Sequence, residues 1–505
     1  MSGVLLPLFS LRSSTDLGVG DFGALNGFFS WMQAAGQRLL MLLPLLPTAP
    51  GDSSPYSTRS AFGLNALYID LSRLPEHVSL TDDERRVIDE ARARATVDYP
   101  AVFKVKGAAL ERAYARYQAT DGRGGASEER FQAFCESERD WLETFALYAS
   151  LSEAQGQKPW WEWEPSLARR ESAALMKARL EHASRIRYHA WLQWVAAQQW
   201  ADVRAQARAA GIVLCGDEPF IVGKDSADCW QFPHLLRSDG RLGVPPDDFS
   251  ADGQDWGLPW FDFDAMERDG YAWLKARARK AAETYDVRRV DHAIGYFRQW
   301  VRDEATPRGR FVPPEEPRQR ALGEKHFRLL SEGAGVIAED LGVIPPFATE
   351  TLRALSLPGF FVMRWARADG VYQDPRQYPE VSLATTGTHD TESLRASWEG
   401  SPLWEREAMV RTFPELAGLS PAGNEFTPAV HEALIAAAEN ARSNLCVIPW
   451  PDVFAESARI NHPGTVGDHN WVYRMAWPVE ELLNHEAPKA GAAWLRRLSE
   501  QGQRL

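Results

Sequence analysis

Three short stretches of the chain end in acidic residues that could carry out chemistry on a glycosidic bond. The acids are Asp291 after the apolar stretch 287–290, Glu339 after 335–338, and Asp390 at the end of the small-residue stretch 383–390. Cleaving an acetal at an anomeric carbon requires one carboxylate and one carboxylic acid flanking that carbon. The pattern therefore indicates glycoside chemistry at three strand ends.

The expected roles follow from the neighbours of each acid. We expect Asp291 to be the nucleophile of a retaining mechanism, which passes through a covalent glycosyl-enzyme. Arg289 lies two residues earlier, so on a strand it points to the same face and could hold that carboxylate ionised and oriented. Glu339 is the expected acid/base, whose pKa must be high enough to keep a proton until transfer. Asp390 and His389 are expected to hydrogen-bond the distorted sugar and stabilise its developing positive charge.

The same residues allow other interpretations. An acid at a strand end can simply cap the next helix, and for any one acid alone this competes evenly with catalysis. Three such ends together favour catalysis. Asp340 follows Glu339 directly and points the other way on a strand, so it is the less favoured acid. His292 and His389 lack the spacing of metal ligands, and no phosphate-binding pattern is present, so no metal or cofactor is expected.

The elements that must position these acids fit a parallel barrel, in which the strand ends carry the chemistry. Residues 24–35 are expected to form a helix and 38–43 a buried strand, and the chain continues with about seven or eight strand–helix units. We therefore predict an α/β fold, a (β/α)8 TIM barrel with large, mainly helical insertions. The 505 residues are expected to form a single catalytic domain, 1–505.

Two segments depart from the barrel pattern. Residues 75–210 carry helical periodicity, with a capping box at Thr81 and Glu84, and are expected to form a mostly helical insertion. The segment 241–265 contains too much Pro, Gly and Asp for regular structure. A long ordered loop inside a compact domain is usually functional, so we expect a lid loop over the acids.

Composition limits the possible partners. The net charge of −13 argues against nucleic acid and against an anionic membrane surface. The longest apolar run is far shorter than the roughly 18 residues of a membrane span. Four scattered cysteines without metal-ligand spacing indicate reduced core thiols and a cytoplasmic protein. The 20 tryptophans favour sugar binding, because pyranose C–H groups pack on flat aromatic faces.

At this level of detail the chain resembles the amylomaltases, 4-α-glucanotransferases of glycoside hydrolase family 77. The resemblance rests on the stretches Gly-Asp-Ser-Ser-Pro-Tyr at 51–56, Gly-Val-Pro-Pro-Asp at 243–247, Gly-Gln-Asp-Trp-Gly at 253–257, Arg-Val-Asp-His at 289–292, Ala-Glu-Asp-Leu-Gly at 338–342 and Thr-His-Asp at 388–390. It implies the barrel fold, the three acid roles given above, and no metal or organic cofactor. The positions that match the family's substrate contacts are Tyr56, Asp217, Gln254, Trp256, Arg289, His292, His389 and Asn461. Taken alone, Tyr56 is typical of an aromatic residue in a surface loop.

The resemblance also implies the substrates. These would be maltooligosaccharides, amylose or glycogen-derived glucans, between which the protein would transfer α-1,4-glucan segments. The sequence does not fix the oligomeric state, and a monomer is the expectation. Two alternatives remain open from the residues: a retaining α-1,4-glucan hydrolase with the same acids, and a non-catalytic glucan-binding protein, which the intact acids disfavour.

Overall fold

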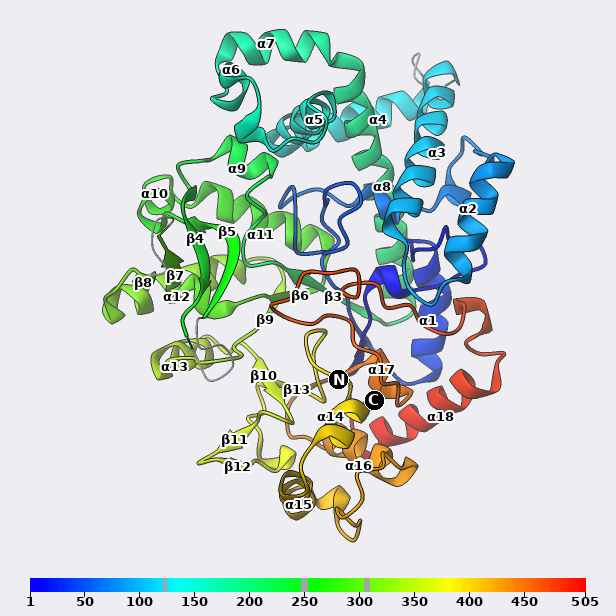
Figure 1. Cartoon of the computed structure of the whole chain (residues 1–505), viewed down its shortest axis with the longest axis vertical. Helices are drawn as coiled ribbons and strands as arrows, with labels where there is room; N and C mark the ends of the chain where they lie inside the picture. The colour runs from blue at the N-terminus through cyan, green and yellow to red at the C-terminus, as the bar shows by residue number, and fades with distance from the viewer. Residues whose placement is uncertain (121–124, 247–252, 304–308) are drawn as a thin grey trace.

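The chain is organised around an eight-stranded parallel sheet that curls into a barrel (Figure 1). The computed structural model describes residues 1–120, 125–246, 253–303 and 309–505. The barrel strands are β1 (Ser2–Leu5), β2 (Leu39–Met41), β3 (Val213–Glu218), β6 (Val287–Val290), β9 (Gly335–Ala338), β10 (Gly359–Val362), β13 (Ser382–Thr385) and β14 (Leu445–Pro449). The predicted (β/α)8 barrel is thus confirmed.

The order of the strands around the barrel follows the chain. The hydrogen-bonded order is β10-β13-β14-β1-β2-β3-β6-β9, and each neighbouring pair is parallel. The remaining edge, between β9 and β10, is bridged where the N–H of Ala338 donates to the carbonyl of Pro358 at 2.8 Å. Every strand therefore ends at the same rim, which is where barrel enzymes place their chemistry.

The barrel strands are covered on both faces. All residues of β1, β2 and β13 are buried, which agrees with continuous apolar runs rather than alternation.

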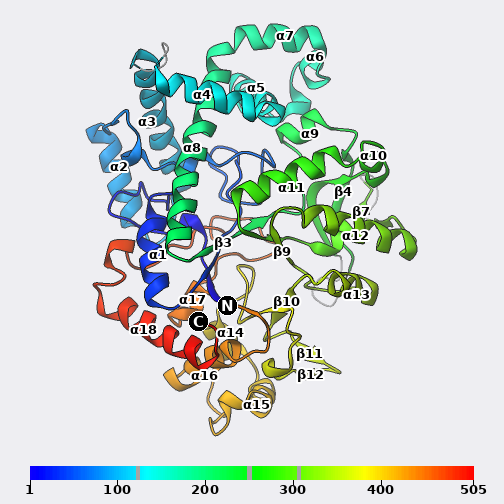
Figure 2. The ribbon, with the colours of Figure 1, turned by 180° about the vertical axis from the view of Figure 1, so that it is seen from behind.

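Helices form the outer layer of the barrel. They include α1 (Ala24–Ala34), α8 (Ala183–Ala209), α11 (Ala272–Thr284), α12 (Glu316–Leu330), α13 (Pro346–Ala354), α16 (Pro428–Glu439) and α18 (Glu486–Gln501). The last helix, α18, lies beside α1 and α16 (Figure 2).

The segment 75–210 is mostly helical, as predicted. Its helices before α8 are α2 (Asp82–Ala93), α3 (Tyr99–Thr120), α4 (Ala126–Ser137), α5 (Arg139–Ala154), α6 (Pro165–Ala168) and α7 (Ser172–Glu181). The capping box is confirmed, because Thr81 and Glu84 each bond the other's backbone N–H at the start of α2. In Figure 1, α4 to α7 lie at the top of the view and α2 and α3 at its upper right, above the barrel strands.

The segment 241–265 corrects one prediction. Its described residues are mostly regular, because β4 (Leu236–Val244) and β5 (Gln254–Phe261) pair as antiparallel strands. Together with β7 (Gln299–Arg302) and β8 (Gly309–Val312) they make a four-stranded sheet beside the barrel. Cross-strand pairing overrides the weak strand propensity of Gly, Pro and Asp, and register shifts along β4 absorb them. Residues 247–252 of the predicted lid lie outside the described residues.

Besides short 3-10 helices, the described residues form several smaller elements. They are α9 (Ala227–Gln231), α10 (Phe263–Arg268), α14 (Leu394–Gly400), α15 (Leu403–Thr412), α17 (Trp450–Val453) and the hairpin of β11 (Arg367–Ala368) and β12 (Val371–Tyr372). Within the described ranges, no helix has the length and apolar character needed to cross a bilayer.

Candidate active site

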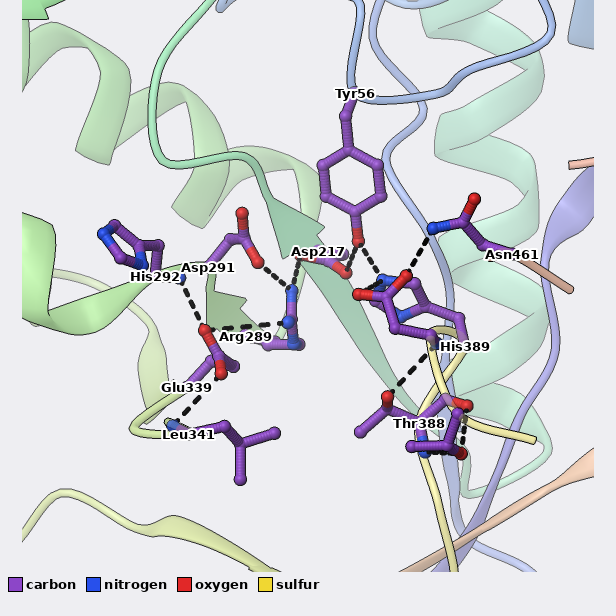
Figure 3. A network of polar contacts seen from close by, with 12 residues as sticks. Tyr56, Asp217, Arg289, Asp291, His292, Glu339, Leu341, Thr388, His389 and Asn461 are labelled. Carbon is purple, nitrogen blue, oxygen red and sulfur yellow. Dashed lines mark hydrogen bonds and ion pairs between the residues drawn. The ribbon is translucent and has the colours of Figure 1, made fainter. Parts of the chain in front are cut away.

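The rim of the barrel gathers most of the residues singled out from the sequence (Figure 3). Asp217 lies near the end of β3, Asp291 directly follows β6, and Glu339 directly follows β9. His389 and Asp390 follow β13. Tyr56 comes from the loop after β2, and Asn461 from the segment after α17. Residues far apart in the chain therefore meet because consecutive parallel strands end side by side.

Arg289 is the centre of the charged network. In the sheet register it is paired with Asp217 of β3, so the two side chains share the inner face of the barrel. Its Nη1 lies 2.7 Å from Oδ1 of Asp217 and 2.9 Å from Oδ1 of Asp291. Its Nη2 lies 4.0 Å from Oε2 of Glu339. Arg289 is 4% exposed, so this cation acts in a largely desolvated setting, and the predicted contact with Asp291 is confirmed.

A left-handed turn links Asp291 to Glu339. His292 has a φ of 46°, in the region that L-residues other than Asn, Asp and His seldom adopt. Three successive N–H groups are used in this turn: that of Asp291 donates to the carbonyl of Glu218, that of His292 to Oε2 of Glu339, and that of Ala293 to the carbonyl of Glu339. The backbone that carries one acid thus fixes the side chain of the other.

The environment of Glu339 suits a proton donor. Burial raises the pKa of Glu339 to about 7, the positive charge of Arg289 opposes that rise, and the negative charge of Asp291 adds to it. Besides the N–H of His292, its carboxyl accepts from the N–H of Leu341 at 3.1 Å. A carboxyl group with a pKa near 7 holds a proton for a substantial part of the time at neutral pH.

The environment of Asp390 favours its ionised form. Burial alone would raise its pKa, but the charge of His389, the hydrogen bond from that ring and the hydrogen bond from Asn461 lower the pKa of Asp390 to about 2. Asn461 Nδ2 donates to Oδ1 at 2.6 Å, and His389 Nε2 lies 3.3 Å from Oδ2. Asp390 is therefore ionised at neutral pH. Its side chain remains 39% exposed at the rim, where it can meet a ligand.

Tyr56 connects the two halves of the site. Its hydroxyl donates to Oδ2 of Asp217 at 2.6 Å and lies 2.9 Å from Nε2 of His389. Its ring stacks near that of His389 at a centroid distance of 5.5 Å. The interpretation of Tyr56, taken alone, as a surface loop aromatic is wrong, since its hydroxyl enters the polar network of the site.

The hairpin of β4 and β5 brings one of its two predicted contact residues to the site. The indole of Trp256 meets the ring of His292 edge to face at 4.8 Å. Trp256 Nε1 donates to Oε1 of Gln254 at 3.0 Å, so Gln254 supports the indole rather than touching an acid. Burial lowers the pKa of His292 to about 4, despite the nearby charge of Asp291, and this imidazole is neutral at pH 7.

Several residues at the site were not predicted from the sequence. Trp471 lies 5.4 Å from the ring of Tyr56 and 5.8 Å from that of His389. Its only sequence signal is its place ten residues after Asn461, a predicted substrate contact. Arg459 donates to the backbone carbonyls of Asp390 and Asn461, and nothing in the local pattern marked it.

A buried ion cluster behind the site was also missed. Glu218, one residue after Asp217, lies 2.8 Å from Nε of Arg277 and 3.2 Å from Nη1 of Arg288. All three are almost fully buried, which ties the end of β3 to β6 and α11. Among the described residues, no group of three or more His, Cys, Asp or Glu is arranged to hold a metal ion.

The arrangement defines a class of protein. The rim of this (β/α)8 barrel presents a carboxylate in contact with an arginine, a carboxyl group with a raised pKa and a third carboxylate, which is ionised. Chemistry at an anomeric carbon requires groups of this kind, so the protein is a carbohydrate-active barrel.

Comparisons with known proteins narrow this class to one family. The family model described as 4-alpha-glucanotransferase, glycoside hydrolase family 77, matches residues 6–480. A 4-alpha-glucanotransferase of Thermus thermophilus is 34% identical, with 100% of this chain and 99% of the relative covered. One from Chlamydia caviae is 31% identical, with 97% and 93% covered. The chain belongs to glycoside hydrolase family 77.

Solved structures agree with this assignment. An amylomaltase from Streptococcus agalactiae, in complex with acarbose, matches with a TM-score of 0.84 at 27% identity, covering 100% of this chain and 99% of the other. An amylomaltase from Corynebacterium glutamicum matches with a TM-score of 0.83 at 23% identity, covering 99% of this chain and 75% of the other, which supports the fold.

Proposed function

We propose that this protein is a 4-alpha-glucanotransferase that moves α-1,4-glucan segments between maltooligosaccharides with retention of anomeric configuration. Family membership supports the activity, since the relatives bear that name. The observation that carries the mechanism is the pair of carboxyl groups beside Arg289: Asp291 in contact with the guanidinium, and Glu339 with a pKa of about 7.

In the first half of the reaction, a carboxylate oxygen of Asp291 attacks C1 of the donor glucan. A C1–O bond to Asp291 forms as the bond from C1 to the leaving O4 breaks, and its electron pair goes to that oxygen. Glu339 donates its proton to the leaving oxygen. Arg289 orients Asp291 for attack, because its guanidinium nitrogen lies 2.9 Å from Oδ1 of Asp291.

In the second half, a 4-hydroxyl group of an acceptor glucan attacks C1 of the covalent intermediate. Glu339, now ionised, removes the proton of that hydroxyl, and Asp291 departs as a carboxylate. Two inversions at C1 give net retention. Asp390, ionised because of His389 and Asn461, stabilises the positive charge that develops on the sugar ring in both steps.

The remaining site residues would hold the glucan. Tyr56, Asp217, Trp256, His292, His389 and Asn461 line or support the rim and are the proposed substrate contacts, with Gln254 acting through Trp256. Trp256 belongs to the hairpin of β4 and β5, which we propose covers the acids and disfavours attack by water. Transfer exceeds hydrolysis when a sugar hydroxyl reaches the intermediate before water does.

The proposed substrates are maltooligosaccharides, amylose or glycogen-derived glucans, and the proposed place of action is the cytoplasm. The four cysteines are free thiols, three of them buried, which fits a reducing compartment.

Incubation with maltotriose as the sole substrate tests the proposed activity. A transferase yields glucose together with a ladder of longer maltodextrins, while the number of reducing ends stays constant. A hydrolase yields only shorter sugars, and its reducing ends increase. The second result would replace the proposed transferase by a retaining α-glucan hydrolase.

A further inference from the structure

The guanidinium of Arg459 binds the backbone carbonyl of Asp390 rather than its carboxylate. Its Nη2 donates to the backbone carbonyl of Asp390 at 2.6 Å, and its Nε donates to the backbone carbonyl of Asn461 at 2.7 Å. One guanidinium therefore joins two segments of the rim: the loop after β13, which carries Asp390, and the segment after α17, which carries Asn461.

The same two segments are joined by two more hydrogen bonds. The N–H of Asn461 donates to the carbonyl of His389 at 3.1 Å, and its side-chain Nδ2 donates to Oδ1 of Asp390 at 2.6 Å. Of these bonds, only the last reaches the carboxylate itself. Its geometry depends on where the two backbones lie relative to each other, which is what Arg459 fixes.

The contacts and the exposure of Arg459 differ from those of a solvated surface arginine. The acid closest to this guanidinium is Glu392, whose Oε1 is 3.9 Å from Nη1 and whose side chain is 55% exposed, so this ion pair contributes little. Arg459 itself is only 24% exposed. Its short hydrogen bonds go to two carbonyls, and a planar guanidinium can serve both at fixed geometry where an ammonium cannot.

We propose that Arg459 is a positioning residue that acts through Asp390 and Asn461, holding them as one unit against the sugar as charge develops at C1. This rests on the proposed function of Asp390. Without the guanidinium, the hydrogen bond from the Asn461 N–H to the His389 carbonyl remains. The two segments should therefore be held less precisely but should not unfold.

The first test compares Arg459→Gln and Arg459→Lys in maltotriose disproportionation. Displacement of a transition-state group by about 1 Å costs up to about 100-fold, so we expect kcat to fall about 10- to 100-fold in Arg459→Gln. KM should change much less, since Asp390 acts mainly in the transition state. Arg459→Lys should lie between Arg459→Gln and the wild type, because an ammonium can reach only one of the two carbonyls.

Arg395 provides a matched control. It also reaches a carbonyl of the same segment, that of Ala455 at 3.5 Å, and pairs with Glu399 at 3.0 Å, but it does not contact Asp390 or Asn461. Arg395→Gln should keep wild-type kcat. Equal losses in Arg395→Gln and Arg459→Gln would show a general effect on the segment and overturn the proposal.

A double-mutant cycle with Asn461→Ala separates positioning from a structural role. If Arg459 acts partly through the bond from Asn461 to Asp390, Arg459→Gln should lower kcat by a clearly smaller factor in the Asn461→Ala background than in the wild type. Effects that multiply, or an unchanged kcat in Arg459→Gln, would overturn the proposal. The wild-type enzyme is assayed in parallel. If it makes no maltodextrin ladder, the proposed function fails, and that outcome is distinct from a failure confined to the Arg459 variants.

Discussion

The backbone N–H of His292 donates a hydrogen bond of 2.8 Å to Oε2 of Glu339. His292 directly follows Asp291, so the turn that ends the nucleophile's strand also orients the proposed acid/base. The two carboxyl groups come from neighbouring strands, β6 and β9, and their relative position is set by backbone as well as by Arg289. This geometry makes the backbone conformation at residue 292 a testable feature.

The φ of 46° at His292 predicts an unusual order of stability for two substitutions. His292→Gly should be about 1 kcal/mol more stable than His292→Ala, because a left-handed conformation costs a residue with a Cβ about 1–2 kcal/mol. Both variants lack the imidazole, so their difference reports the backbone. Urea unfolding monitored by tryptophan fluorescence measures it.

The matched control for this pair lies on the exposed face of α11. Lys275→Gly should be about 1 kcal/mol less stable than Lys275→Ala, because glycine is disfavoured in a helix interior. If both positions favour alanine, the left-handed turn at His292 does not exist in solution.

The raised pKa of Glu339 predicts a loss of activity at alkaline pH. The first half-reaction needs the protonated form, which is present below the pKa of about 7 and lost above it. We therefore expect kcat/KM to decline tenfold per pH unit on an alkaline limb centred near pH 7. The measurement is the pH profile of kcat/KM for maltotriose.

Glu339→Gln tests whether that limb belongs to Glu339. The variant should lose at least about 100-fold of its activity on maltotriose, in line with the usual contribution of general acid catalysis. A donor with a fluoride leaving group needs no proton from the enzyme, so glycosylation by such a donor should be largely spared and should show no alkaline limb near pH 7. An alkaline limb that persists in the variant would assign the titration to another group.

Removing the cation at position 289 should destabilise the fold. Arg289→Met leaves Asp217, which is 1% exposed, without its ion-pair partner, and breaking a buried pair in this way costs about 3–5 kcal/mol. Arg289→Lys should lose less stability, because the charge remains, although an ammonium cannot bridge Asp217 and Asp291 with the same geometry.

Urea unfolding at pH 7 compares these variants with Arg376→Met. Arg376 pairs with Asp374 at the surface, where solvent screens the ion pair and it contributes little to stability. Equal midpoints for Arg289→Met and Arg376→Met would contradict a buried, structurally required cation at the site.

The sequence was sufficient to predict where the acids would meet but not how they are held. Asp291 and Glu339 directly follow apolar strand segments, and parallel strands of a barrel end at one rim, so local pattern and topology together place them. Arg289 could be assigned to Asp291 because two residues on one strand share a face. These are short-range rules, and the structure confirms the contacts they predict.

The contacts that escaped prediction join residues far apart in the chain. Tyr56 meets His389, 333 positions away in the chain, and Arg459 reaches Asp390 from another loop. Neither pairing leaves a local signal. The hairpin of β4 and β5 was missed for a different reason, since its Pro, Gly and Asp content predicts a loop and only pairing with neighbouring strands makes it regular.

The central claim is that a carboxylate oxygen of Asp291 becomes covalently bonded to C1 of the donor glucan. The most direct measurement is peptide mass spectrometry of the enzyme after trapping with a fluorinated glucosyl donor whose intermediate breaks down slowly. We predict one glucosyl adduct, carried by the peptide that contains Asp291 and absent from Asp291→Asn. An adduct on any other residue, or unchanged turnover in Asp291→Asn, would contradict it.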